Sequence, residues 1–297
     1  IRRARVAPVS RHGRLVRLVG LTLEATGLSV PHGALCSIDT VEKGTMAAEV
    51  VGFHEGVTYL MPFGEPRGIA PGATVRVLRT HPKAPVGPEL LSRVLNANGN
   101  PLDGLPAPVC EEERPLMGEV LNPLEREPIR DILDVGIKAI NGLLTLGRGQ
   151  RVGLMAGSGV GKSVLLGMMT RFTEADVVVI GLIGERGREV NEFIRESLGP
   201  EGMRKAVVIA APANVSPALR LRAAHYTHLI AEYFRDQGKN VLMLVDSLTR
   251  VAHAQREIGL AIGEPPTAKG YPPSVFALLP GLIERAVPFP VSPDPGI

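Results

Sequence analysis

The sequence has 297 residues, of which 44% are hydrophobic and 21% charged, and its formal net charge is +3. This length exceeds that of one small domain, and the composition is that of an ordinary globular protein with a sizeable core. Aromatic residues make up only 4%, tryptophan is absent, and no concentrated basic stripe occurs. These features argue against a protein that binds nucleic acid.

The cysteine content and hydropathy indicate a cytosolic protein. Cys36 and Cys110 are far apart and lack metal-ligand spacing, which favours a reducing compartment. No signal peptide and no apolar run of bilayer length are visible. Because the chain starts at Ile1 rather than methionine, we expect the natural N-terminus to be missing.

Residues 1–80 are predicted to form a small N-terminal β-barrel domain. Short apolar runs at 15–23, 48–51, 57–61 and 72–78 are separated by turn residues such as those at 31–33. Residues 81–130 contain prolines throughout, which exclude long helices. We expect this stretch to be a Pro/Gly-rich connector with short strands, packed on the next domain.

From about residue 131 the pattern becomes alternating strands and helices. Short strands are predicted at 152–155, 176–183, 206–211 and 241–245, and the longer β-branched runs are typical of buried parallel strands. One helix should start at Lys162 and place Val164, Leu165, Met168, Met169 and Phe172 on one apolar face. A second should run from the Ser216 cap to Gly238. The order predicts a doubly wound α/β domain over 131–286.

The segment from Ala156 to Ser163 reads AGSGVGKS and lies between a predicted strand and a predicted helix, as a phosphate-binding loop does. In such a loop the backbone N–H groups surround phosphate oxygens, here those of Gly157, Ser158, Gly159, Val160 and Gly161. Lys162 is predicted to reach the β- and γ-phosphates, and Ser163 to bind Mg²⁺. Ala156 replaces the usual first glycine, which is tolerable if its φ stays in the β region.

Further charged residues follow two of the predicted strands. Asp246 ends the last strand and could hold Mg²⁺, or cap the next helix. Glu185 is a candidate to orient and polarise the attacking water, although a charged, solvated turn would look the same. Arg186 could fix that turn or touch the γ-phosphate. Arg250 could sense the γ-phosphate or form a structural ion pair.

These motifs resemble the family of rotary hexameric ATPases, which comprises ATP synthase catalytic subunits, type III secretion ATPases and flagellar export ATPases. The resemblance runs from about residue 10 to Ala286, and the segments 153–168 and 181–190 are most similar to flagellar export ATPases. Further matches occur at 246–250, 254–258 and 263–276. Injectisome ATPases typically have Cys-Gly-Lys-Thr where this chain has Val160-Gly161-Lys162-Ser163.

The resemblance implies a β-barrel followed by a RecA-like core in a homohexameric ATPase of the two-sector, protein-export type. ATP and Mg²⁺ would be bound by Lys162, Ser163 and Asp246, with Glu185 as the catalytic carboxylate. The implied partners are a stator-like regulator, a central stalk protein, export chaperones and an export gate, at the cytoplasmic face of the membrane. Residues 287–297 do not match the family, whose arginine finger and adenine pocket lie beyond this point. The tail therefore suggests truncation and an inactive fragment.

Three other functions fit parts of this pattern. An injectisome ATPase would share the fold but not the loop sequence. A ring subunit that binds nucleotide without hydrolysing it would lack the glutamate at position 185. An RNA-translocating helicase ring would need stacking aromatics on the barrel, where only Phe53, Tyr59 and Phe63 occur.

Overall fold

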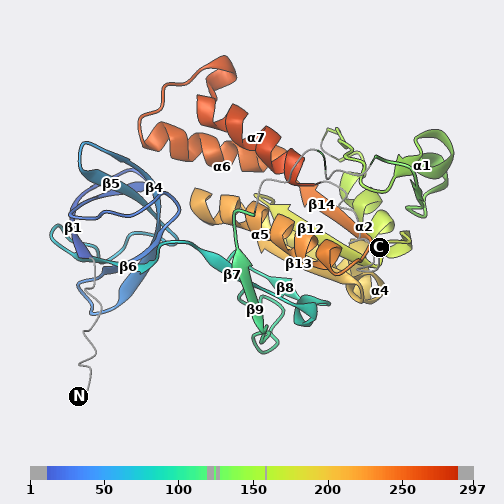
Figure 1. The fold of residues 1–297 in the computed structure, drawn as a ribbon, viewed down its shortest axis with the longest axis horizontal. Helices are drawn as coiled ribbons and strands as arrows, with labels where there is room; N and C mark the ends of the chain where they lie inside the picture. The colour runs from blue at the N-terminus through green and yellow to red at the C-terminus, as the bar shows by residue number, and fades with distance from the viewer. Residues whose placement is uncertain (1–11, 119–123, 125–127, 158, 287–297) are drawn as a thin grey trace. The chain divides into compact units, whose positions relative to one another are not determined.

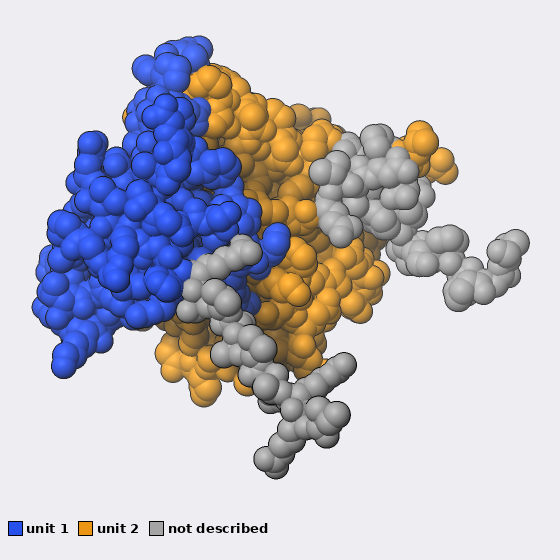
Figure 2. Space-filling model, turned by 60° about the vertical axis from the view of Figure 1, so that its left-hand side comes forward, with its two compact units in different colours: residues 1–82, 257–270 blue, residues 83–256, 271–297 orange. Residues whose placement is uncertain are grey.

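The computed structural model describes residues 12–118, 124, 128–157 and 159–286. The chain divides into two compact units, coloured separately in Figure 2. One unit comprises residues 1–82 and 257–270, and the other comprises residues 83–256 and 271–297. None of the described helices is both long and apolar enough to cross a membrane.

The first unit contains a closed antiparallel barrel with the strand order β1-β2-β5-β4-β3-β6. Its strands are β1 (His12–Val19), β2 (Thr22–Thr26), β3 (Leu35–Asp39), β4 (Thr45–His54), β5 (Val57–Pro62) and β6 (Thr74–Arg79). Inward-facing apolar residues such as Leu23, Ile38 and Leu60 fill its interior. Closure leaves few unpaired strand edges, and the predicted small barrel is confirmed.

The second unit is built on a parallel sheet with the strand order β14-β12-β13-β8 (Figure 1). Its strands are β8 (Val94–Leu95), β12 (Val177–Ile183), β13 (Ala206–Ala211) and β14 (Val241–Asp246). The helices of this unit are η1 (Pro88–Leu90), α1 (Lys138–Leu143), α2 (Lys162–Phe172), α3 (Gly187–Glu192), a π-helix (Phe193–Leu198), α4 (Gly199–Met203), α5 (Pro217–Asp236) and α7 (Pro273–Arg285). Helix α6 (Leu248–Ala261) begins in this unit and ends in the first unit, to which η4 (Ala268–Gly270) belongs. The predicted α/β core is thereby confirmed.

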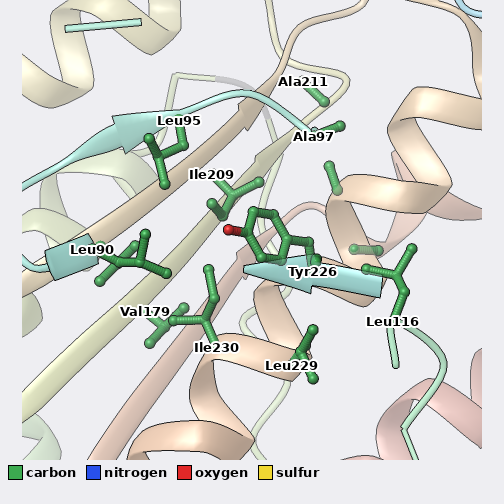
Figure 3. Close-up of a cluster of buried hydrophobic side chains, with 14 of the residues drawn as sticks. Leu90, Leu95, Ala97, Leu116, Val179, Ile209, Ala211, Tyr226, Leu229 and Ile230 are labelled. Carbon is green, nitrogen blue, oxygen red and sulfur yellow. The ribbon is translucent and has the colours of Figure 1, made fainter. Parts of the chain in front are cut away.

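The sheet is covered on both faces, which explains its continuous β-branched runs. Val179 and Ile183 of β12 pack with α5, whose Tyr226 lies in the middle of that cluster (Figure 3). The Tyr226 hydroxyl donates a hydrogen bond of 2.8 Å to the Pro85 carbonyl, so this buried phenol is satisfied. On the opposite face, Ile180 packs with side chains of α2 and the π-helix.

The connector contributes directly to this sheet. Two of its strands, β7 (Lys83–Val86) and β9 (Glu112–Pro115), form a separate antiparallel pair. Between them, β8 pairs in parallel with β13, so residues near 94 belong to the α/β core. A further small pair joins β10 (Ile132–Leu133) to β11 (Leu146–Gly147).

Of two local predictions, one was wrong and one was confirmed only in part. The structure has no strand at 152–155: Val152 is 58% and Met155 93% exposed. An apolar run becomes a strand only where it finds a pairing edge, and among the described residues β14 pairs with β12 alone. In α2 the predicted apolar face is buried only in part: Met169 is buried together with Gly167 and Thr170, whereas Val164 and Phe172 are exposed.

A largely buried ion pair fixes the connector beside β8. Arg93 Nε and Nη2 donate hydrogen bonds of 2.7 and 3.0 Å to the two Asp103 oxygens. Asp103 also accepts the backbone N–H groups of Val94 and Leu105. The hydrogen bond from Arg93 is the main reason why the pKa of Asp103 falls to about 2.

We expect Asp103→Ala to lower the free energy of unfolding by about 1–3 kcal/mol, because it leaves the Arg93 guanidinium and two backbone donors unsatisfied. Since the folded pKa is lower than the unfolded one, Asp103 stabilises the parent above about pH 4. That contribution disappears as the pH falls towards about 2. Urea denaturation at pH 7 and pH 3 should therefore show a larger difference between parent and variant at pH 7. An equal difference at both pH values would contradict this assignment.

Candidate functional site

The predicted phosphate-binding loop lies exposed at the N-terminus of α2. Gly159 and Gly161 have φ values of 79° and 91°, and Gly161 is the N-cap residue. These left-handed conformations are readily available only to glycine. No atom lies within 4 Å of a Cβ built on Gly157, Gly159 or Gly161, so the space beside the backbone is open. Ser158 lies outside the described residues.

Lys162, the first residue of α2, is brought to Asp246 at the end of β14. Its Nζ lies 2.5 Å from Asp246 Oδ1. Asp246 is only 4% exposed, and a buried carboxylate of this kind requires a partner that compensates its charge. The lysine provides that charge here, and Ser163 follows it in the first turn of the same helix.

Glu185 follows β12, the strand beside β14. In the β12–β14 register, Leu182 is opposite Asp246, so the two strands end close together. Two backbone hydrogen bonds hold the loop that contains Glu185. The Gly184 N–H donates to Ala211 O at 2.7 Å, and the Ala213 N–H donates to Glu185 O at 2.9 Å. These bonds join the Glu185 loop to the segment after β13.

Burial is the largest cause of the raised pKa of Glu185, followed by a hydrogen bond with Glu189 and repulsion from Asp246. The positive charges of Lys162 and Arg250 act in the opposite direction. Residues from α2, β14, α6 and the Glu185 loop therefore influence one another electrostatically. A carboxyl with a raised pKa among such neighbours is typical of a functional site.

Arg250, in α6, packs directly on the backbone of the Glu185 loop. Gly184 has a φ of 73°, and a Cβ there would lie 2.5 Å from Arg250 Cβ and 2.9 Å from its Cγ. Glycine is therefore required at position 184 both for its conformation and for this contact. The charge of Arg250 also lowers the pKa of Glu189.

Arg186 and Glu189 form the start of α3. The Arg186 side chain is 82% exposed, and its Nη1 lies 3.4 Å from Glu189 Oε1. The Arg186 backbone N–H donates to Glu189 Oε2 at 3.4 Å. The sequence reasoning gave no role to Glu189. The sequence feature that could have indicated it is an acidic residue at the third position of a helix, whose carboxylate can accept a hydrogen bond from the N-cap backbone N–H.

The donor set beside the loop consists of a serine hydroxyl and carboxylates. Hard oxygen ligands of this kind suit Mg²⁺, which commonly retains several waters and uses one or two protein ligands with phosphate oxygens. Ser163 and Asp246 fit that requirement by their chemistry and by their positions beside Lys162.

Comparison with known proteins identifies the family. Residues 15–79 match the β-barrel domain of the ATP synthase alpha/beta family, and residues 136–293 match its nucleotide-binding domain. The second match extends to residue 293, so the expectation that the family resemblance ends at Ala286 was wrong. The chain is 59% identical to the "Flagellum-specific ATP synthase" of Salmonella typhimurium over 288 residues, which cover 94% of this chain and 63% of that protein. It is 60% identical to the Pseudomonas aeruginosa protein of the same name, covering 92% of the chain and 61% of that protein.

More distant relatives include injectisome proteins. The "Type 3 secretion system ATPase" of Xanthomonas euvesicatoria is 48% identical, with 95% of this chain and 64% of that protein covered. The assembled ATPase EscN of enteropathogenic E. coli is structurally similar, with a TM-score of 0.87 and 42% identity, covering 94% of this chain and 67% of that one. The chain thus spans a little over three fifths of the length of its flagellar relatives. It belongs to the ATP synthase alpha/beta family.

Proposed function

We propose that the protein hydrolyses ATP to ADP and phosphate with Mg²⁺ at the site formed by Lys162, Ser163, Glu185 and Asp246. The main observation in support is that Lys162 of the proposed phosphate-binding loop contacts Asp246, and that both residues influence the raised pKa of Glu185. The relatives are named as flagellar and type III secretion ATPases, which supports the same reaction.

ATP binding begins with the exposed glycine loop. The open space beside Gly157, Gly159 and Gly161 lets their backbone N–H groups approach phosphate oxygens, while the N-terminus of α2 favours the same negative charge. Lys162 then exchanges the Asp246 carboxylate for the β- and γ-phosphates. This exchange keeps the ammonium paired with an anion throughout.

Ser163 and Asp246 would hold Mg²⁺ beside the phosphates, and the ion would supply positive charge against the charge developing on the phosphoryl oxygens. The departure of Lys162 leaves the buried Asp246 carboxylate available to the metal or to its waters. With Mg²⁺ bound, the negative charge of Asp246 would again be compensated by a cation.

Glu185 is the group that would orient the attacking water and accept its proton. Its raised pKa makes it a better proton acceptor than an ordinary glutamate, and Glu189 is placed to hydrogen-bond it. Arg250, lying on Gly184, would direct positive charge towards the γ-phosphate. The exposed side chain of Arg186 would add a second positive charge near the γ-phosphate after a small movement.

The biological role we propose is the energising of flagellar type III protein export and flagellum assembly. The identities of 59% and 60% to flagellar proteins exceed the 48% to the Xanthomonas secretion ATPase, which makes the injectisome the second candidate. A homohexamer with a central stalk is proposed because EscN is known as an assembled ATPase and in complex with its central stalk EscO. A stator-like regulator, export chaperones and an export gate at the cytoplasmic membrane face complete the proposed setting.

The proposed reaction is tested by two measurements on purified protein. A version of the protein as long as its relatives should bind a fluorescent ATP analogue in the presence of Mg²⁺. A version as long as its relatives should release phosphate from ATP only when Mg²⁺ is present. If the longer protein binds ATP without releasing phosphate, a non-hydrolysing ring subunit is the better description, and the absence of nucleotide binding would refute the proposed site.

A matched variant tests the exchange of Lys162 between Asp246 and phosphate. We expect Asp246→Asn to bind Mg²⁺-free ATP about tenfold more tightly, because the lysine is released and a negative charge near the phosphates is removed. The same variant should lose the gain in affinity that Mg²⁺ gives the parent. Titration of the fluorescent analogue with and without EDTA measures both effects. Weaker Mg²⁺-free binding by Asp246→Asn would contradict the exchange.

A further inference from the structure

The phosphate-loop helix α2 packs against the segment that follows the Glu185 loop at a distance too short for any side chain at residue 167. Gly167 is buried in the middle of α2. A Cβ there would lie 2.5 Å from the Ser197 carbonyl oxygen and 2.7 Å from Ser197 Cβ. The carbonyl is part of the backbone, so it cannot rotate away as the end of a long side chain could.

The backbone conformation does not explain this glycine. Gly167 has ordinary helical geometry, without the positive φ of Gly161 and Gly184. A glycine inside a helix costs about 1 kcal/mol relative to alanine. The close approach to Ser197 is therefore the physical reason for glycine at this position.

Ser197 belongs to the π-helix Phe193–Leu198, which continues α3 without a break. Hydrogen bonding from residue i to i+5 makes one turn wider than in an α-helix, and such turns are frequent at functional sites. Residues five apart then lie on nearly the same side. Accordingly, Phe193 and Leu198 are both buried in one cluster with Ile180 of the sheet, and Leu166 of α2 packs against this cluster.

A second glycine repeats the close approach further along α2. A Cβ at Gly202, in α4, would lie 3.1 Å from Arg171 Cγ and 3.0 Å from Leu198 Cδ1. These neighbours are side-chain atoms and can give way. The contact of Gly167 with the π-helix is thus rigid, whereas the contact of Gly202 with α2 can adjust through side-chain movement.

We propose that Gly167 is a positioning residue, which fixes the distance between the phosphate-binding loop and Glu185 through its contact with Ser197. The proposal rests on the proposed function. Lys162 begins the same helix little more than one turn before Gly167. Glu185 lies in the loop that leads through α3 into the π-helix carrying Ser197. The contact consequently couples the element that binds phosphate to the element that carries the catalytic carboxylate.

Gly167→Ala should impair catalysis more than binding. The added methyl group forces α2 and the π-helix apart by roughly half an ångström or more, because protein interiors have no free space to absorb it. Misplacement on the order of 1 Å can cost about 100-fold in rate. We expect turnover to fall about 10- to 100-fold, while the affinity for ATP stays within about threefold of the parent.

The experiment compares turnover, ATP affinity and trapping of MgADP with aluminium fluoride, an analogue of the phosphoryl-transfer transition state. All three measurements use a version as long as its relatives. Gly281→Ala is the matched control, since it is also a helical glycine and no atom lies within 4 Å of its Cβ. The control should behave like the parent in all three measurements.

The outcomes separate this proposal from the proposed function. A parent that neither binds nor hydrolyses ATP would refute the proposed function itself. An active parent together with a Gly167→Ala variant within twofold of its turnover and trapping would overturn the positioning role. If Gly167→Ala no longer unfolds cooperatively, Gly202→Ala decides the question. The positioning role predicts a loss of a few-fold in turnover with unchanged affinity for Gly202→Ala, and parental turnover would refute that role.

Discussion

Replacing Lys162 with alanine is expected to abolish measurable ATP binding, with a loss of about 10³-fold or more in affinity. The variant loses the ammonium that pairs with phosphate, and it leaves the buried Asp246 carboxylate without the partner 2.5 Å away. Truncating one member of a buried charge pair costs about 2–5 kcal/mol, part of which comes from the charge left behind. That unpaired negative charge would also repel the phosphates. Titration of a fluorescent ATP analogue measures the loss.

Two further variants isolate the cause. Lys162→Arg keeps the charge but replaces a compact ammonium with a planar guanidinium, and it should recover only part of the affinity. Lys239→Ala removes an exposed lysine after α5 and should bind ATP like the parent. If Lys162→Ala binds within threefold of the parent, the segment 156–163 does not bind phosphate as proposed.

Glu185→Gln should separate hydrolysis from binding. Glutamine has nearly the same shape but cannot accept the proton of the attacking water, and general bases contribute about 10²–10⁴-fold to rates. We expect turnover to fall by roughly 10³-fold with ATP affinity within a few-fold of the parent. Glu192→Gln, at the end of α3, is the control and should retain turnover. Equal turnover by Glu185→Gln and the parent would show that Glu185 does not accept the proton of the attacking water.

The raised pKa of Glu185 also predicts a pH dependence. Because its pKa lies above the ordinary glutamate value of about 4.3, turnover should decline with acid at a higher pH than that. Its folded pKa exceeds its unfolded one, so the ionised carboxylate disfavours the folded state at neutral pH. Glu185→Gln should therefore raise the melting temperature at pH 7. A lower melting temperature would show that this carboxylate stabilises the fold.

The sequence predicted the elements whose local signals agreed with their surroundings. The Ser216 cap, the proline after it and Gly238 delimit α5, which indeed runs from Pro217 to Asp236, with the Ser216 hydroxyl accepting from Leu219 N–H. The apolar run before Asp246 became β14. Each of these signals depends on residues close in sequence, so no knowledge of the tertiary structure was needed.

Features that depend on contacts between distant segments were not predictable. The strand expected at 152–155 needed a partner edge, which periodicity cannot supply. The predicted apolar face of α2 is buried only in part, and Gly167, not a large apolar residue, makes its closest contact. The grouping of Lys162 with Asp246 was predicted from strand order, whereas the contact of Arg250 with Gly184 became visible only in the structure.

The β8 strand changes where this protein can be divided. The stretch at 81–130 was expected to be a connector, yet its residues Val94 and Leu95 extend the sheet beside Val208 and Ile209. A fragment starting at 131 would leave the backbone groups of β13 without those hydrogen bonds and open an apolar edge to other chains. For expression of the α/β unit alone, the structure sets Lys83 as the starting residue.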